Sequence, residues 1–222
     1  MSPMPRASRP LIASMSLNAA LLALVALKVR VMGLRVIAQK LAGRAPELPD
    51  FAGIARARFL PGRQGLITFV GDSQVEYAPL LEMLDLPYRN RGLGHARIAN
   101  LLDWLDLVLA EHPPLLVIMI GSNDVYFGVP LADSLDAAGR VLDRIAEQPG
   151  CAATFLSVPP VPGHEGAAAQ LNAGLSALVT ARGHSWLDLT PTLSSMTWTD
   201  DTLHLNPAAY RAIAPLIAAA IR

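Results

Sequence analysis

The stretch Leu66-Ile67-Thr68-Phe69-Val70-Gly71-Asp72-Ser73-Gln74 decides the fold, because an apolar run ends there in a short polar block. A second apolar run, residues 115–120, ends in the same way at Gly121-Ser122-Asn123-Asp124. Short apolar runs bounded by glycine or proline are typical of buried strands. In open parallel sheets, reactive groups collect beyond the carboxyl ends of the strands. We therefore expect Ser73 and Asn123 to lie near each other at one edge of a sheet.

The chain from Gly65 onward alternates strand-like runs, loops and helical patterns, which favours a parallel α/β sheet. Between His95 and Glu111, for example, the apolar residues follow a helical spacing that gives one buried face. Pro207 suits the first turn of a last helix, where its missing N–H is not needed. The expected strands are 66–71, 87–90, 115–121, 152–158 and 185–189, and the expected helices are 95–111, 131–145, 167–180 and 207–221.

Two further polar blocks, Asn90-Arg91-Gly92 and Asp201-Thr202-Leu203-His204, complete a set of residues suited to acyl transfer. A serine hydroxyl is a weak nucleophile and needs a base, and histidine suits that task because its ordinary pKa is near neutrality. A carboxylate on the far ring nitrogen holds the tautomer and stabilises the imidazolium. We therefore predict Ser73 as the nucleophile, His204 as the base and Asp201 as the residue that orients the base.

The tetrahedral intermediate of acyl transfer carries a negative oxygen, which needs preorganised hydrogen-bond donors. A main-chain N–H beside glycine and a side-chain carboxamide both meet this need. We predict that the N–H groups of Ser73 and Gly92 and the side chain of Asn123 form this oxyanion hole. For Asn123 the alternative is a capped turn, which is a common role of asparagine.

The four blocks resemble those of the SGNH, or GDSL-type, hydrolase family, which is named after a Ser, a Gly, an Asn and a His in this order. The resemblance covers residues 66 to 210 and implies a three-layer α/β/α sandwich with a flavodoxin-like, five-stranded parallel sheet. It also implies ester hydrolysis, usually without a metal. The family pattern places the acid three residues before the histidine, which selects Asp201 over Asp200. One departure is Gln74, where the family often has leucine, at a position without chemistry in the family scheme.

Several polar residues near these blocks have simpler interpretations. Asp72 is expected to cap the turn or the following helix rather than to react, because acids favour helix N-termini. His164 follows an expected strand and faces the correct edge, but no carboxylate stands at a fixed spacing from it. Tyr126 and Phe127 either line a substrate pocket or belong to a plain surface loop. The other histidines, His95, His112 and His184, are weaker candidates for the base.

No cofactor or metal is expected. The segment Gly92-Leu93-Gly94-His95-Ala96-Arg97 imitates a dinucleotide-binding fingerprint, but Arg97 occupies the third glycine position, where it is too large for close packing. No acid follows at the end of a second strand about twenty residues on, so we set NAD binding aside. No histidine, cysteine and carboxylate cluster has the spacing of metal ligands. The single cysteine, Cys151, cannot form an internal disulfide.

The N-terminal segment contains an uncharged run, residues 11–27, between basic flanks. Its length lies at the lower limit for a membrane-spanning helix, and no convincing signal-peptide cleavage site follows. We favour a retained membrane anchor, followed by a basic amphipathic stretch on anionic headgroups. The alternative is a helix packed on the domain or on a partner chain. The flanking charges predict opposite orientations, so the side of the membrane stays open.

Length and charge indicate one domain with an extension. Residues 1–65 hold ten basic and two acidic residues, a net charge of +8, and the remainder holds eight and sixteen, a net charge of −8. Such a split suggests a basic arm with its own partner, but no nucleic-acid module is recognisable. We expect a membrane-associating segment at 1–44, a linker rich in proline and glycine at 45–64, and a hydrolase domain at 65–222.

These observations predict a serine hydrolase that cleaves carboxylic esters through an acyl-enzyme. The expected substrate is a small-molecule ester, namely a lipid, a short acyl ester or an acylated glycan. One alternative is an O-acyltransferase or deacetylase that acts on a glycan or a lipid. Another is a catalytically silent, membrane-associated binding protein, for which the basic N-terminal segment would be the working part.

Overall fold

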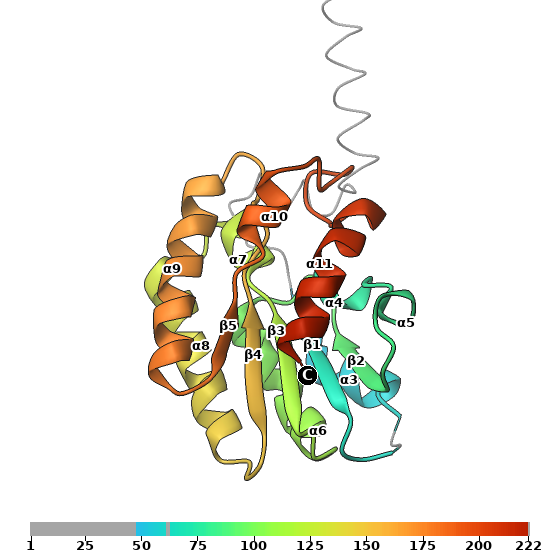
Figure 1. The fold of residues 1–222 in the computed structure, drawn as a ribbon. Coiled ribbons are helices and arrows are strands. Elements are labelled where there is room, and N and C mark those ends of the chain that lie inside the picture. The colour runs from blue at the N-terminus through green and yellow to red at the C-terminus, as the bar shows by residue number, and fades with distance from the viewer. Residues whose placement is uncertain (1–47, 61–62, 222) are drawn as a thin grey trace, which may run out of the picture. The chain divides into compact units, whose positions relative to one another are not determined.

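A computed structural model describes residues 48–60 and 63–221, which form a five-stranded parallel sheet with helices on both faces (Figure 1). The strand order is β2-β1-β3-β4-β5, and all four neighbouring pairs are parallel. This is the flavodoxin-like order of doubly wound sheets. The strands are β1 (Ile67–Gly71), β2 (Tyr88–Gly92), β3 (Leu115–Met119), β4 (Ala152–Leu156) and β5 (Ser185–Leu187).

The helices connect successive strands or follow the last one. Four of them span at least eight residues after β2: α6 (Leu102–Leu109), α8 (Leu131–Ala146), α9 (Glu165–Ala181) and α11 (Pro207–Ala220). The shorter elements are α4 (Ser73–Glu76), α5 (Leu80–Met83), the 3₁₀-helix η1 (Ile98–Leu101), α7 (Ser122–Phe127) and α10 (Thr190–Ser194). One eight-residue helix, α3 (Phe51–Arg58), precedes the sheet.

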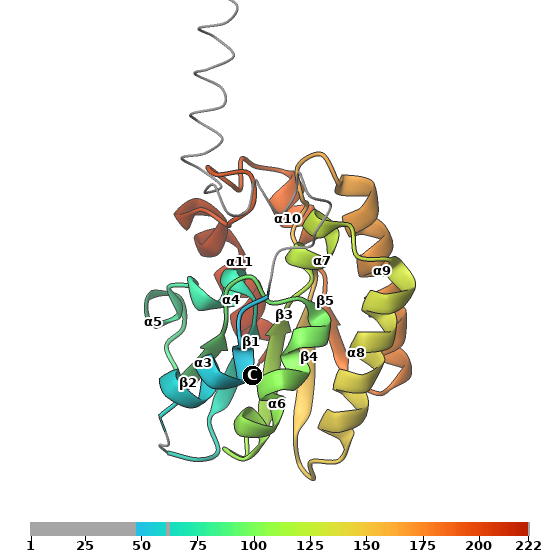
Figure 2. The same ribbon diagram turned by 180° about the vertical axis from the view of Figure 1, so that it is seen from behind.

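Two apolar clusters lie on the two faces of the sheet, because successive side chains of a strand point to opposite faces. Phe69 and Val117 belong to the cluster that includes residues of α5, α10 and α11. Their neighbours Val70 and Ile118 belong to the cluster that includes residues of α3, α6, α8 and α9. Figures 1 and 2 show these two layers of helices from opposite sides. Strands buried on both faces explain why β3 is apolar throughout and β1 is apolar apart from Thr68.

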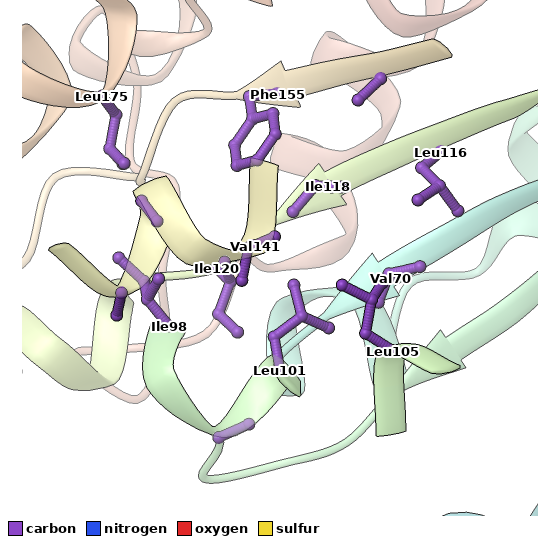
Figure 3. Packing of buried hydrophobic residues seen from close by; sticks show 14 of the residues in the cluster. Val70, Ile98, Leu101, Leu105, Leu116, Ile118, Ile120, Val141, Phe155 and Leu175 are labelled. Atoms are coloured by element: carbon purple, nitrogen blue, oxygen red, sulfur yellow. The ribbon is translucent and has the colours of Figure 1, made fainter. Parts of the chain in front are cut away.

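Figure 3 shows the larger cluster from close by, with Leu101 and Leu105 facing Val70 of the sheet. Val141 of α8 and Ile98 of η1 pack in the same layer, and all of these side chains are at most 1% exposed. The predicted fold class is therefore confirmed, and each of the five expected strands is present.

The structure differs from the expected linker at 45–64, because α3 lies inside that range. Asp50 caps this helix by accepting a hydrogen bond from the N–H of Gly53 at 2.9 Å. Phe51 and Ala55 are buried in the larger cluster, and the ring of Phe51 lies 5.7 Å from that of Trp104. Two core residues four positions apart are too few for a visible helical pattern, and the neighbouring prolines and glycines conceal it.

The predicted membrane-associating segment, residues 1–44, lies outside the described residues. Within residues 48–60 and 63–221, no helix combines the length and the apolar character needed to cross a bilayer.

Candidate active site

The expected site lies where β1, β2 and β3 end side by side, since Gly71 pairs with both Gly92 and Met119. Ser73 is the first residue of α4, directly after β1, and Asn123 belongs to α7, after β3. Both helices begin at the carboxyl end of the sheet (Figure 1). Both residues are buried at this edge, since Ser73 is 6% exposed and Asn123 is 2% exposed.

His204 joins this edge from the loop before α11. Its Nε2 lies 2.9 Å from Oγ of Ser73, and its Nδ1 lies 2.6 Å from Oδ2 of Asp201. When the imidazole is protonated on Nδ1, it donates to Asp201 and accepts from the Ser73 hydroxyl. The three side chains that the sequence singled out, although separated by up to 131 positions, therefore form one continuous hydrogen-bonded chain.

The carboxylate of Asp201 organises its own loop as well as the imidazole. Its Oδ1 accepts hydrogen bonds from the N–H groups of Leu203 at 3.0 Å and His204 at 2.7 Å. Partial burial acts to raise the pKa of Asp201, but the hydrogen bonds from His204 and Leu203 outweigh burial and hold the pKa at about 2. Asp201 is thus ionised at neutral pH, as a residue that stabilises an imidazolium must be.

The choice between the two neighbouring aspartates follows from their contacts. Asp200 accepts a hydrogen bond from Nδ2 of Asn206 at 3.3 Å, whereas Asp201 contacts the imidazole. Between Asp201 and His204, Thr202 has a φ of +74°, a left-handed conformation that is unusual for a β-branched residue. This residue turns the chain so that the carboxylate and the imidazole face each other over only three positions.

Asn123 lies in the first turn of α7 and is anchored by one of its two amide hydrogens. Its Nδ2 donates to the main-chain oxygen of Ala96 at 3.0 Å. A carboxamide nitrogen carries two hydrogens, so one N–H of Asn123 is left for a substrate oxygen. The N-cap of α7 is Gly121, whose φ of +128° favours glycine and whose hydrogen in place of a Cβ avoids the side chain of Val158.

Gly92 has a different environment from the one expected. Its N–H already donates to Oδ1 of Asn90 at 2.9 Å, so this donor is occupied in the structure. A Cβ at position 92 would collide with the main-chain nitrogen of Glu76. Glycine is therefore needed here for the close approach of β2 to α4, and the predicted oxyanion donor at Gly92 requires correction.

The loop after β2 offers another main-chain donor. Among residues 92–98, all of which the structure describes, only the N–H of His95 has no hydrogen-bond partner. His95 has a φ of +66° and lies between Gly94 and Ala96. A Cβ at Gly94 would lie 3.7 Å from Cβ of Ser73, while the oxygen of Ala96 binds Asn123. The two neighbours of His95 thus lie near Ser73 and Asn123, which makes the N–H of His95 a candidate donor for the same site.

Two buried carboxyl groups support this edge without contacting His204. Asp72 caps α4 by accepting from the N–H of Gln74 at 2.9 Å, as expected, and complete burial raises its pKa to about 7. Asp124 accepts from the N–H of Ile98 at 3.0 Å and from the hydroxyl of Ser134 at 3.2 Å. Burial raises the pKa of Asp124 to about 6, partly offset by these hydrogen bonds.

Aromatic side chains flank the site. The ring of Tyr77, which is 59% exposed, lies 5.4 Å from the imidazole of His204 in an edge-on arrangement. Sequence reasoning missed Tyr77, although its position one helical turn after Ser73 was a usable signal. Tyr126 contacts Phe127 at 5.2 Å and His164 at 6.3 Å between ring centroids. These three residues, two at the end of α7 and one just before α9, thus form a second aromatic group.

A cavity of about 540 Å³ lies elsewhere, between α9, β5 and α10, and is lined by residues such as Asn172, Trp186 and Asp188. None of the residues that line it belongs to the chain of Ser73, His204 and Asp201. In the described part of the molecule, no group of three or more His, Cys, Asp or Glu side chains is placed to hold a metal ion.

Solved structures with this fold include several esterases. An acetylxylan esterase from Geobacillus stearothermophilus is 14% identical, with a TM-score of 0.61, and the match covers 72% of this chain and 96% of that one. An aryl esterase from M. smegmatis is 20% identical, with a TM-score of 0.60, over 71% and 98% of the two chains. A lipase/acylhydrolase from Enterococcus faecalis is 18% identical, with a TM-score of 0.61, over 70% and 95%. At these identities the likeness establishes the fold.

The fold and the site define an α/β protein with a serine, a histidine and an aspartate hydrogen-bonded at the carboxyl ends of its strands. Residues 64–212 match the model of the GDSL-like lipase/acylhydrolase family, so the chain belongs to that family. A comparison with curated proteins finds no match. At the level of the family, the chain is a hydrolase of the lipase/acylhydrolase type.

Proposed function

We propose that this protein is a serine esterase that hydrolyses small carboxylic esters through an acyl-enzyme on Ser73. The observation that carries the proposal is the hydrogen-bonded chain, with 2.9 Å from Ser73 to His204 and 2.6 Å from His204 to Asp201. Nucleophile, base and orienting acid in one such chain are the requirements for activating a serine hydroxyl. A silent binding protein would have no need of this arrangement.

The reaction then follows from the positions of the atoms. Oγ of Ser73 bonds to the ester carbonyl carbon while its proton passes to Nε2 of His204, and the carbonyl oxygen becomes an oxyanion. When the tetrahedral intermediate collapses, the bond to the alcohol oxygen breaks and His204 returns the proton to the leaving alcohol. Water then attacks the acyl-enzyme with His204 as base, releases the carboxylic acid and restores the Ser73 hydroxyl. Asp201 stays ionised and stabilises the imidazolium during both halves.

The oxyanion would be held by three donors. The N–H of Ser73 lies in the first turn of α4, where main-chain N–H groups have no acceptor within the helix. The second is the remaining amide hydrogen of Asn123. For the third we replace Gly92, whose N–H is occupied, by the free N–H of His95. Donors aimed at the developing charge are usually the largest single contribution to such catalysis.

The surroundings of Ser73 favour esters with a small or flat alcohol or acyl part. Tyr77 presents its ring edge-on beside His204, which suits contact with an apolar group of the substrate. The names of the structural relatives, an acetylxylan esterase and an aryl esterase, support short acyl groups and aryl esters as first substrates to assay. A short-chain aryl ester combines both features.

The test compares wild type with Ser73→Ala on such an ester. We expect the substitution to abolish hydrolysis and covalent labelling by a fluorophosphonate probe while leaving the melting temperature within a few degrees. Ser195→Ala is a matched control, because Ser195 is exposed and its hydroxyl bonds only to the main-chain oxygen of Thr192. Full residual hydrolysis in Ser73→Ala would refute the nucleophile, and a wild type that neither hydrolyses nor labels would refute the esterase.

A further inference from the structure

Gln74, the residue directly after Ser73, departs from the leucine that is frequent in the family and was expected to have no part in the chemistry. Its side chain is completely buried. Burying a carboxamide is unfavourable unless its donor and its acceptor are both satisfied. The partners of this side chain therefore indicate what the residue does.

Both partners of the Gln74 carboxamide belong to the loop that carries His204. Its Nε2 donates to the main-chain oxygen of Leu203 at 2.7 Å. Its Oε1 accepts from the main-chain N–H of Leu205 at 3.0 Å. One side chain thus holds the backbone on both sides of His204, and it does so from the residue next to the proposed nucleophile.

The other hydrogen bonds of this loop do not fix its distance from Ser73. Apart from the imidazole–Ser73 contact and the Gln74 pair, the hydrogen bonds of residues 199–205 in the described structure go to one another or to Asn206. They shape the loop internally. The hydrogen bonds from the Gln74 side chain are therefore the ones that connect the main chain of the base-bearing loop to the end of β1.

A further contact anchors Gln74 itself. The hydroxyl of Tyr210, on α11, donates to the main-chain oxygen of Gln74 at 2.6 Å, and Tyr210 is 5% exposed. The main chain of Gln74 is also held at its N–H by the Asp72 carboxyl group. Because both main-chain groups of Gln74 are held, its carboxamide can set the distance between the His204 loop and Ser73.

We infer that Gln74 is a positioning residue that sets the register of the His204 imidazole on the Ser73 hydroxyl. This inference rests on the proposed function of the two residues. A leucine or methionine side chain at position 74 would fill similar space but would neither donate to Leu203 nor accept from Leu205. The Asp201–His204 pair would survive such a change, because all of its contacts lie within three positions of each other.

The geometry therefore predicts a specific kinetic pattern for Gln74→Met and Gln74→Leu. If His204 remains paired with Asp201 but moves relative to Ser73, the rates of the chemical steps fall while substrate binding stays intact. Displacements of this kind reduce rates by about 10- to 100-fold. We expect kcat for a short-chain aryl ester and the rate of fluorophosphonate labelling to fall by that factor. KM should change by no more than about 2-fold, and the final labelling should still reach about one probe per chain.

Asn172 provides a matched control in the same chain. Its carboxamide also makes a donor–acceptor pair with the main chain, accepting from the N–H of Val158 at 2.8 Å and donating to its oxygen at 2.9 Å. Asn172→Leu loses the same two types of hydrogen bond but touches neither Ser73 nor residues 199–205. We expect its kcat and labelling rate to remain within about 3-fold of wild type. Melting curves for all variants set an assay temperature at which each is folded.

The outcomes separate this inference from the function on which it rests. If Ser73→Ala is inactive but Gln74→Met and Gln74→Leu keep the wild-type kcat and labelling rate, the inference is wrong and the esterase stands. The inference is also wrong if only the final labelling falls, or if Asn172→Leu slows the reaction equally. Should both apolar variants fail to fold, Gln74→Asn decides, because its carboxamide is one methylene shorter and cannot reach both Leu203 and Leu205. An unchanged labelling rate in that variant overturns the inference.

Discussion

The two halves of the site are built in different ways. Ser73, Asp72 and Asn123 stand at the ends of buried parallel strands, and none of them is more than 6% exposed. Asp201 and His204 stand on a surface loop, where their side chains are 55% and 32% exposed. Main-chain hydrogen bonds of the sheet position the first half, whereas side-chain hydrogen bonds position the second. We therefore expect single substitutions on the loop side to change the geometry of the site with little effect on the stability of the fold.

Apart from the loss of the nucleophile itself in Ser73→Ala, the largest effect is expected on the loop side, from Asp201→Asn. The amide oxygen of asparagine still accepts from the N–H groups of Leu203 and His204, but its NH₂ group cannot accept from the imidazole. The wrong tautomer of His204 is then favoured, which lowers kcat by about 10⁴-fold in triads of this kind. Steady-state hydrolysis of an aryl ester measures the effect. Asp200→Asn, which changes the neighbouring acid, should keep most of the activity.

Loss of the Asn123 side chain should produce the next largest effect, on the sheet side. In Asn123→Ala, a donor to the oxyanion disappears together with the hydrogen bond to Ala96. Removal of one such donor lowers kcat by about 10²–10³-fold. Hydrolysis and melting curves measured on the same preparation separate the lost donor from lost stability. An Asn123→Ala variant with wild-type kcat would mean that the oxyanion is held elsewhere.

Asp72 should make the stability of the sheet side depend on pH. Its pKa is raised from 3.8 to about 7 by burial, so between about pH 4 and 7 the folded chain holds a proton that the unfolded chain has released. This group therefore removes stability as the pH rises through that window, and the full loss is present above about pH 7. Asp72→Asn has no carboxyl group to titrate at this position. We expect the variant to gain stability relative to wild type as the pH rises from 4 to 8.

Thermal unfolding of both proteins at several pH values between 4 and 8 measures this change. Asp85→Asn removes one exposed aspartate and serves as the control for net charge. A difference in melting temperature between Asp72→Asn and wild type that stays constant over this range would contradict the prediction.

The smallest effect is expected at Thr202, on the loop side. Its left-handed conformation costs about 1–2 kcal/mol for a residue with a Cβ, while glycine loses about 0.5–1 kcal/mol more backbone entropy on folding. Thr202→Gly should therefore raise the free energy of unfolding by at most about 1.5 kcal/mol and keep kcat within about 3-fold. Thr202→Ala retains the Cβ and should show no gain. Denaturant unfolding of the three proteins tests the order.

The sheet half was easier to predict than the loop half for a physical reason. A buried strand is recognisable from its apolar run, and the residues that follow it must lie at the edge of the sheet. Ser73 and Asn123 do lie in the helices that directly follow β1 and β3. The family pattern, and not the residues alone, selected Asp201 rather than Asp200 as the partner of His204, and Asp201 is the one that contacts the imidazole. Helix α3 was missed because two core residues produce no periodic signal, whereas Tyr77 was missed although it follows Ser73 by one helical turn.

The misjudged residues are those whose contacts lie far away in the chain. Gln74 was discounted, yet its partners Leu203 and Leu205 are about 130 positions away. The opposite error concerns Gly92, which was assigned as a donor although Asn90 occupies its N–H. Neither spacing nor residue type reveals which N–H group a fold leaves free.

The sequence by itself determined the layered fold and the residue types of the site, because burial patterns and short spacings are properties of the linear chain. Tertiary structure alone decided which groups meet across the chain. It brings His204 onto Ser73, it fastens the loop through the Gln74 carboxamide, and it leaves the N–H of His95 without a partner. The physical reason is that a hydrogen bond depends on distances of a few tenths of an ångström, which only the packed chain defines.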